Sequence, residues 1–388
     1  MRKKQFLFWF TFLLVGTLSG MVWAKTPAPL HMASQQWQNM HPQAVQKFLD
    51  EINSQTHGYL PSLNVPQMVK DVLSGKGLDV QAILQGILRY LFSEVLISMQ
   101  LLAKLVIVAV LGAILSHLSS AFERDDVAKL AHSVTFMAIL ALGLGSFSIA
   151  LGLVRGTVHI LTNFMQALLP MIITLIAGMG GITTAGLFHP LLFVMVNLVS
   201  SLVADVVVPL LFIAAIVELV GQFTGYALKP LASLLRQWGL WGLGFFMSLF
   251  IGVISIEGAA GPVADSLLLR SGKFLIGAFV PVVGKFFADA TELVIGSSLI
   301  LEKSIGIVGI MAIFFMVSLP LIKVIALIFI YRIAGALVAP LGAKNIADAL
   351  GTMAGAMTLL SVSLGAVALM FFISLSVMLG IGGAGFLP

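Results

Sequence analysis

The stretch from Leu187 to Gly221 restricts the fold more than any other part of the chain. It is 35 residues long (187 to 221), contains no Lys or Arg, and includes Asp205 and Pro209. As one helix it would be about 50 Å long, whereas the hydrocarbon core of a bilayer is about 30 Å thick. We therefore expect either a long helix bent at Pro209 or two shorter helices that meet near Asp205, since proline removes a backbone donor. Lipid cannot satisfy the freed carbonyl groups, so we expect this element to pack inside a bundle and to line a cavity.

The composition identifies the class of protein. Of the 388 residues, 59% are hydrophobic and 10% are charged, and the mean hydropathy is +1.08, whereas soluble domains contain about 25% charged residues. We therefore predict an all-α, polytopic membrane helix bundle with broken helices. The net charge of +5 is modest and indicates membrane topology and anionic headgroups rather than nucleic acid. The absence of cysteine excludes disulfides and thiolate metal sites.

The N-terminal part is predicted to be a signal peptide followed by a small extracytoplasmic region. Residues 1–24 combine three basic residues with an apolar run and a small residue for cleavage, and the alternative is an uncleaved anchor helix. Residues 25–92 are the only sizeable polar block, and we expect short helices over 41–56, over 66–73 and from Asp79. Its histidines are too scattered along the sequence for a metal site, so we predict none.

Residues 93–380 are predicted to form a transmembrane bundle of about seven spans, followed by a tail at 381–388. The expected spans include 133–154, 160–177, 239–256 and 353–379, and Arg155 and His159 mark the end of the first of these. We expect a break at the glycine-rich stretch 178–181. Prolines at four positions are expected to break or bend further helices: Pro170, Pro209, Pro281 and Pro320.

These prolines also suggest an internal duplication. Pro170 and Pro209 are 39 residues apart, as are Pro281 and Pro320, and the two pairs are offset by 111. The candidate units are 159–256 and 270–366, and duplicated units with broken helices are common in transporters. A gapless comparison of 159–221 with 270–332 gives only seven identities in 63 positions, so the repeat depends on the proline spacing alone.

Charged residues inside the apolar segments are the candidate functional groups. Lys285, Asp289 and Glu292 are spaced i, i+4 and i+7, which places them on one face of a helix. Further charges in predicted spans are Asp205, Glu218, Lys323 and Arg332. Because a charge in lipid costs at least about 2.5 kcal/mol, such residues line a polar pathway or bind a charged group. The alternatives are structural ion pairs that tie helices together, or segment ends at the membrane surface.

Signatures of enzymes are absent from the sequence. It contains no Walker A loop, no HExxH, no GxSxG and no dinucleotide fingerprint in a strand–helix context. We therefore predict no enzymatic activity and no cofactor, and transport powered by ATP would need another subunit.

Three strings mix charges and prolines inside apolar sequence and are much more specific than hydropathy. They are TAGLFHP at 184–190, GAFVPVVGKFFADATELV at 277–294 and LPLIKVIALIFIYRIAGALVAPLG at 319–342. In these strings, and in the order of its segments over residues 68 to 380, the chain resembles the stage III sporulation protein AE family. The region 25–65 resembles this family in layout only.

The resemblance implies a function and a location. Members of that family are made in the mother cell and sit in the membrane that engulfs the forespore, which would place residues 25–92 in the intermembrane space. They belong to a complex with a secretion-type ATPase, ring-forming subunits and a forespore partner, and this complex acts as a channel needed for late forespore gene expression. We therefore expect a permease-like channel subunit. The alternatives are a stand-alone secondary transporter with a site near Asp205, Lys285 and Asp289, and a scaffold that only anchors partners.

Overall fold

The computed structural model describes residues 46–50, 54, 80–121, 125–279 and 283–384. Within these ranges the chain is helical apart from short turns, which confirms the predicted all-α class. Six helical segments are long and apolar enough to cross a membrane: Gln81–Leu115, Ser133–Gly178, Ile182–Thr224, Lys229–Ile256, Ile295–Leu341 and Lys344–Gly380.

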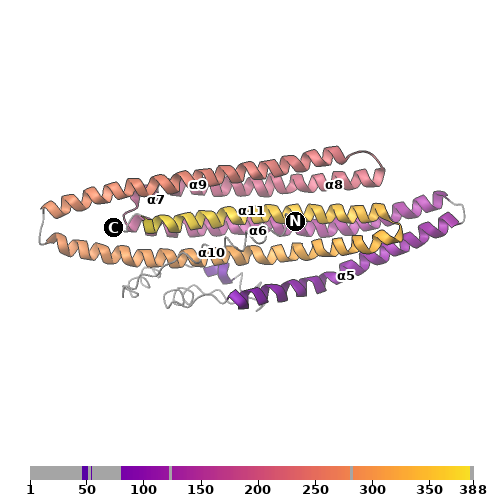
Figure 1. Ribbon diagram of the computed structural model, residues 1–388, viewed down its shortest axis with the longest axis horizontal. Helices are drawn as coiled ribbons and strands as arrows, with labels where there is room; N and C mark the ends of the chain where they lie inside the picture. The colour runs from indigo at the N-terminus through magenta and orange to yellow at the C-terminus, as the bar shows by residue number, and fades with distance from the viewer. Residues whose placement is uncertain (1–45, 51–53, 55–79, 122–124, 280–282, 385–388) are drawn as a thin grey trace.

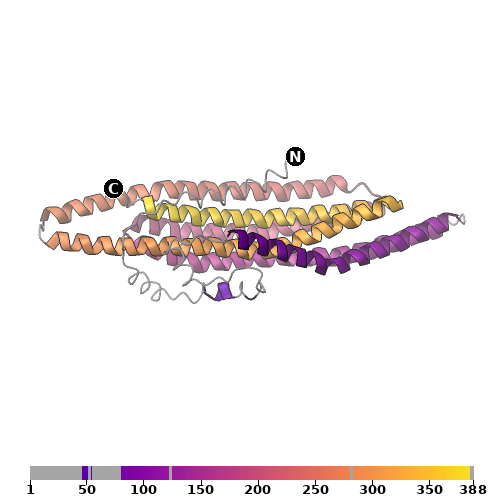
Figure 2. The ribbon, with the colours of Figure 1, turned by 60° about the horizontal axis from the view of Figure 1, so that its bottom comes forward.

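In chain order the elements are α5 (Val80–Ala121), α6 (Asp125–Gly178), α7 (Ile182–Leu202), the π-helix η1 (Val203–Val207), α8 (Val208–Thr224), α9 (Lys229–Phe279), α10 (Val283–Val338), the 3₁₀-helix η2 (Ala339–Leu341) and α11 (Lys344–Ala384). The helices run up and down along one long axis, and both views show an elongated bundle (Figure 1, Figure 2). The last residues of α6, α9 and α11 lie toward one end of the bundle, and those of α5, α8 and α10 lie toward the other.

Several predicted boundaries lie inside continuous helices. The expected spans 133–154 and 160–177 are both parts of α6, which continues past Arg155 and through Pro170. Likewise α10 continues through Pro320, and α5 continues across the boundary expected between residues 92 and 93. Proline in a helix removes only one hydrogen bond, and burial of neighbours such as Leu168 and Leu319 keeps the helix intact on both sides. Pro281 lies outside the described residues.

The stretch Leu187–Gly221 forms α7, η1 and α8 without leaving the helical course. The hydrogen-bond pattern changes only over Val203–Val207, which contains Asp205, and Pro209 is the second residue of α8. The irregularity is thus near Asp205, as expected for two shorter helices that meet there, but α7 and α8 are joined by a π-helical turn rather than separated. Such turns insert an extra residue and are frequent at functional sites.

The core lies where α6, α10 and α11 pack together. Its largest fully buried side chains include Phe164, Phe315, Tyr331 and Phe371. Two glycines let these helices approach closely. A Cβ atom on Gly143 would lie 2.2 Å from the Met353 sulfur, and one on Gly309 would lie 2.8 Å from Leu168. These contacts fix the register of the three helices, as small residues do in membrane bundles.

The predicted break at residues 178–181 is confirmed, and it is held in place from α9. Gly180 has φ +97°, a conformation that glycine adopts without strain. Asp265 accepts the backbone N–H groups of Thr183 at 2.9 Å and Thr184 at 3.0 Å, and so caps the first turn of α7. Burial raises the pKa of the Asp265 carboxyl, but the hydrogen bonds from Thr184 and Thr183 outweigh it and leave this pKa below the usual 3.8.

Little of the polar N-terminal region 25–92 is described before α5. The helical residues 46–50 pack against the bundle: Leu49 is fully buried, and the ring of Phe48 meets that of Phe164 edge-on with centroids 5.8 Å apart. This contact lies within the helix predicted over 41–56. The signal peptide predicted over 1–24 and the helix predicted over 66–73 lie outside the described residues.

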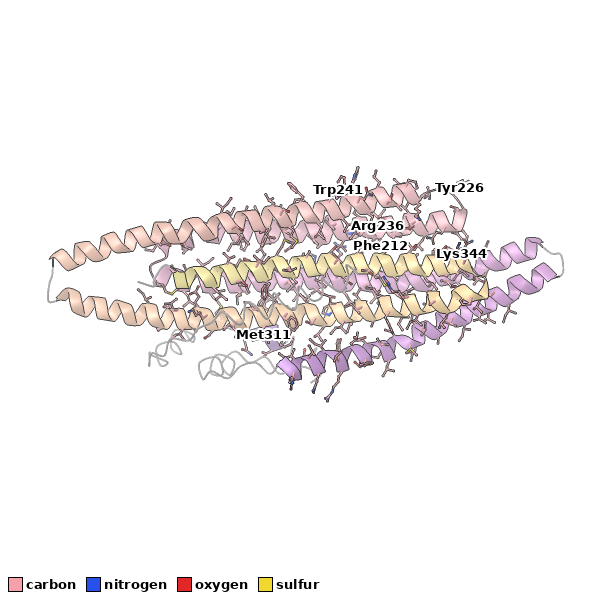
Figure 3. All side chains as sticks on the ribbon, viewed as in Figure 1. Phe212, Tyr226, Arg236, Trp241, Met311 and Lys344 are labelled. Atoms are coloured by element: carbon pink, nitrogen blue, oxygen red, sulfur yellow. The ribbon has the colours of Figure 1, made fainter. Side chains whose placement is uncertain are left out.

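Apolar side chains cover much of the outer surface, as expected for a bundle that faces lipid. The sticks in Figure 3 project outward along the helices; Tyr226 lies at the α8–α9 turn, and Trp241 lies on the outside of α9 further from this turn. Trp238 and Trp241 are both strongly exposed, as tryptophans are at the boundary between lipid and water.

Candidate functional site

A row of polar side chains lies on the outer surface of α6 and of the α7–η1 segment, within two of the apolar spans. We call this row the polar stripe. Its members on α6 recur at helical spacing and face outward or partly outward, and those on α7 and η1 do the same. The polar stripe consists of Arg155, His159, Asn163, Gln166 and Thr174 on α6, and Asn197, Ser201 and Asp205 on α7 and η1.

At one end of the polar stripe, Arg155 and Asp205 form an ion pair. The Nη2 atom of Arg155 lies 2.7 Å from Oδ1 of Asp205, and the two side chains are 40% and 49% exposed. Arg155 lies near the middle of the span Ser133–Gly178, and Asp205 near the middle of Ile182–Thr224. The structure therefore places a charged pair at mid-span on the outer surface, where an isolated chain would expose it to acyl chains.

Further along the stripe, amide groups join α6 to α7. Nε2 of Gln166 donates to Oδ1 of Asn197 at 2.5 Å, and Nδ2 of Asn197 donates to the Phe193 carbonyl at 2.7 Å. Thr174 donates its hydroxyl to the carbonyl of Pro170 at 2.7 Å. The bond between Gln166 and Asn197 joins the two helices of the α6–α7 hairpin, whereas the other two bonds lie within single helices.

The remaining members of the stripe have unused hydrogen-bonding groups. The side chains of His159, Asn163 and Ser201 are exposed and make no hydrogen bond or ion pair with any other described residue. From Arg155 to Thr174 the stripe rises about 29 Å, which is close to the hydrocarbon thickness of a bilayer. A polar surface of this length can conduct or bind polar species if protein rather than lipid covers it.

Two further ion pairs join helices within the spans. Nζ of Lys323 on α10 lies 3.6 Å from Oε1 of Glu94 on α5, which also accepts the hydroxyl of Tyr90 at 3.1 Å. Glu218 on α8 pairs with Arg236 on α9. For these pairs, the structure agrees with the alternative that intramembrane charges tie helices together.

The predicted functional charges are therefore separated in the structure. Asp205 belongs to the polar stripe, whereas Lys323 lies on α10 against α5. The side chains of Lys285, Asp289 and Glu292 lie outside the described residues, although their backbone is part of α10. Their proposed shared face stays a prediction.

Sequence reasoning missed part of the stripe. It interpreted Arg155 and His159 as the end of a span, but α6 continues for more than 20 residues after Arg155. The available signal was the polar spacing 155, 159, 163 and 166, which repeats at three or four residues in apolar sequence. It also missed Glu302, which lies in the α10 core with no exposed surface.

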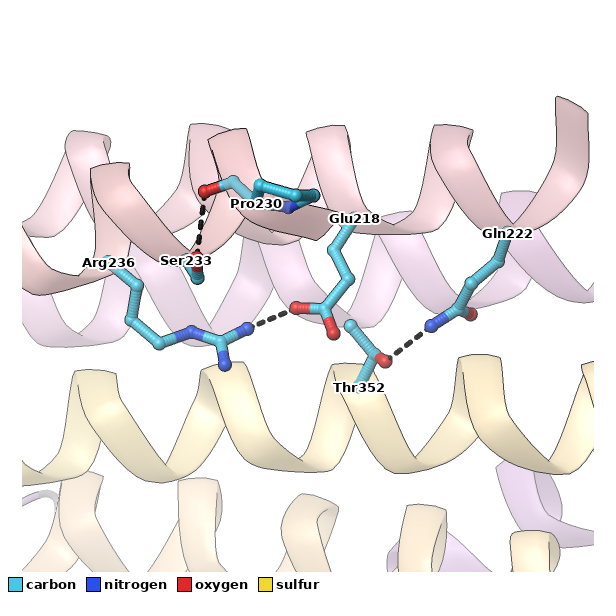
Figure 4. A network of polar contacts seen from close by, with 6 residues as sticks. All are labelled: Glu218, Gln222, Pro230, Ser233, Arg236 and Thr352. Carbon is cyan, nitrogen blue, oxygen red and sulfur yellow. Dashed lines mark hydrogen bonds and ion pairs between the residues drawn. The ribbon is translucent and has the colours of Figure 1, made fainter. Parts of the chain in front are cut away.

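A second polar cluster lies at the end of the bundle where α8, α9 and α11 meet. The close-up in Figure 4 shows Arg236 reaching toward Glu218, and Gln222 reaching toward Thr352 on α11. Nε2 of Gln222 donates to Oγ1 of Thr352 at 2.8 Å. Among the described residues, no three His, Asp or Glu side chains gather closely enough to hold a metal ion.

Comparison with known proteins gives two matches over most of the chain. The family model described as Stage III sporulation protein AE matches residues 63–382. A protein named Stage III sporulation protein AE, from Bacillus subtilis (strain 168), is 35% identical over 337 residues, which cover 87% of this chain and 84% of that protein. No solved structure is significantly similar.

Proposed function

Because this chain belongs to the stage III sporulation protein AE family, we propose that it is the permease-like membrane subunit of a sporulation channel that connects mother cell and forespore. In this proposal it lies in the mother-cell membrane that engulfs the forespore, with residues 25–92 in the intermembrane space. Its partners are the ATPase, the ring-forming subunits and the forespore component of the same complex.

The polar stripe is the observation that supports this proposal most strongly. Charged and amide side chains at mid-span cost at least about 2.5 kcal/mol per charge when they face lipid. Arg155, His159, Asn163 and Asp205 all lie on the outer surface of two spans. In the working assembly another protein surface or water therefore covers them. A polar surface that continues along two neighbouring spans suits the wall of a polar passage between subunits.

The packing of the core favours a passage at the outer surface. Large apolar side chains, among them Phe164, Phe315 and Phe371, fill the space between α6, α10 and α11. A stand-alone transporter would need its polar site between these helices, but Asp205 lies on the outside. Flux of small ions through proteoliposomes that contain only this chain would favour the stand-alone transporter instead.

The test uses apolar substitutions in the polar stripe. They should be harmless or stabilising if the stripe faces lipid, and should abolish function if it lines a polar passage. Replacing His159 and Asn163 together by leucine would stabilise a lipid-facing surface. If the stripe lines a passage, His159→Leu with Asn163→Leu should abolish sporulation while the chain still copurifies with the ATPase of its complex. The matched control is Val134→Leu with Met137→Leu, two exposed apolar positions on the same helix.

Two results would contradict the proposal. Normal sporulation of the double-leucine strain would show that the polar groups of the stripe are dispensable. Loss of the ATPase from the purified complex would show that the stripe holds partners together, as the scaffold alternative requires.

A further inference from the structure

A pocket of about 580 Å³ opens at the end of the bundle, between the last turns of α8 and the first turns of α9 and α11. Its polar lining residues include Glu218, Gln222, Lys229, Arg236, Asp348 and Thr352. Gly351 and Gly355 form part of its α11 wall, and a Cβ atom at either position would meet open space. The pocket therefore has room beside α11 for a group larger than water.

The pocket contains unused groups of both charge signs. Lys229 and Asp348 are exposed and form no ion pair with any other described residue, whereas Arg236 pairs with Glu218, which is only 13% exposed. Its buried carbonyl acceptor, Oε1 of Gln222, has no hydrogen-bond donor in the described part of the chain. The pocket thus has cationic side chains, Lys229 and Arg236, that can bind an anionic group. It also has acceptors, on Asp348 and Gln222, that can bind a cationic donor.

The position of the pocket indicates the depth of its ligand in the membrane. Trp238 and Trp241 lie on α9 just beyond Arg236, and exposed tryptophans mark the boundary between acyl chains and headgroups. The exposed side chains of Leu231 and Leu234 lie with the two tryptophans on the outer face of α9, whereas Arg236 faces the pocket. A molecule that occupies the pocket at this depth has its polar part among headgroups and can extend an apolar part toward the acyl region beyond the tryptophans.

We propose that this pocket binds the headgroup of a phospholipid that carries both a phosphate and a primary amine. The phosphate lies against Lys229 and Arg236, and the ammonium group lies against Asp348 and Oε1 of Gln222. The acyl chains extend from the pocket toward the hydrocarbon side of Trp238 and Trp241. This inference is independent of the channel proposal, since it concerns the opposite end of α8 from the polar stripe.

The experiment is native mass spectrometry of the full chain released from detergent. We would add phospholipids with identical dioleoyl chains and ethanolamine, glycerol or choline headgroups, and inorganic phosphate in a separate arm. The ethanolamine lipid should be retained most. Lys229→Gln should lower the retention of both the ethanolamine and the glycerol lipid by roughly threefold, because both carry the phosphate.

Asp348→Asn provides the selective arm. It should lower retention of the ethanolamine lipid by roughly threefold and leave the glycerol lipid unchanged, because only the former has an ammonium group. Both substituted residues are exposed, so their replacement leaves the packing intact, and Lys344→Gln at the same end is the matched control. Equal retention of the three lipids, no effect of either variant, or displacement of the lipid by inorganic phosphate would overturn the proposal.

Discussion

Glu302 lies in the core of α10 with 0% of its surface exposed, and both carboxyl oxygens lack a partner among the described residues. A carboxyl group in such a place is least costly when it is neutral. We therefore expect Glu302→Gln to change the free energy of unfolding by less than about 1 kcal/mol, and Glu302→Lys to cost about 3 kcal/mol or more. Thermal unfolding in detergent measures both. Equal losses in the two variants would show that the carboxyl makes a contact that glutamine cannot replace.

Asp265 makes the stability of the α6–α7 turn depend on pH. The pKa of Asp265 is lower in the folded chain than in the unfolded chain. Its carboxylate therefore stabilises the fold fully above the unfolded-state pKa, and this stabilisation is lost as the pH falls through the folded-state pKa. Asp265→Asn should lower the free energy of unfolding by about 1 kcal/mol at pH 7. Below about pH 4 the variant should lose less stability than the unchanged chain, because it has no carboxylate to protonate at this position. Unfolding measured at pH 7 and pH 3 tests this, with Ser255→Ala on the same helix as the control. An unchanged pH dependence in the Asn variant would contradict it.

The ion pair between Arg155 and Asp205 connects two elements, α6 and the π-helical turn η1. Removing one charge leaves the other unpaired at mid-span, whereas removing both leaves none. Arg155→Met and Asp205→Asn should each destabilise the chain by about 2 kcal/mol, and the double variant should lose less than the sum. Unfolding in lipid nanodiscs gives the coupling energy. Additive losses would show that the two charges act separately.

The turn between α6 and α7 requires a left-handed residue at one position. Gly180 has φ +97°, so Gly180→Ala should cost about 1 to 2 kcal/mol. Gly178 is the matched control, since it is the last residue of α6 and a Cβ atom there would meet nothing within 4 Å. Gly178→Ala should be neutral or slightly stabilising. Similar unfolding temperatures for the two variants would contradict this account of the turn.

Across the whole molecule, the sequence was sufficient to predict the fold class but not the helix boundaries. Hydropathy is a property of segments, so composition and apolar runs predicted a helical membrane bundle. Proline and arginine were interpreted as helix ends because of their local preferences, yet α6 continues through Pro170 and past Arg155. In each case the packing of neighbouring helices, which one sequence does not reveal, outweighs the local preference.

The candidate site was predictable only in part, because the sequence reveals which residues are charged but not which helix faces pack together. The sequence identified Asp205 as an intramembrane charge, and its Pro209 neighbour indicated an irregular helix there. Its partner Arg155 lies 50 residues earlier, and the pairing depends on the register of α6 against α7. The outward direction of the polar stripe also depends on which helix faces pack together, so the expected interior site is on the outer surface instead.

The central claim is that the polar stripe faces a water-filled passage in the assembled complex. The chain contains no cysteine, so a single thiol can be placed without other changes. Asn163→Cys in the stripe and Ile107→Cys on the exposed apolar surface of α5 would be treated, in the intact complex, with a charged thiol reagent that cannot cross membranes. We predict that the thiol at 163 reacts and the thiol at 107 does not. A thiol at 163 that stays unreacted until detergent is added would contradict the claim.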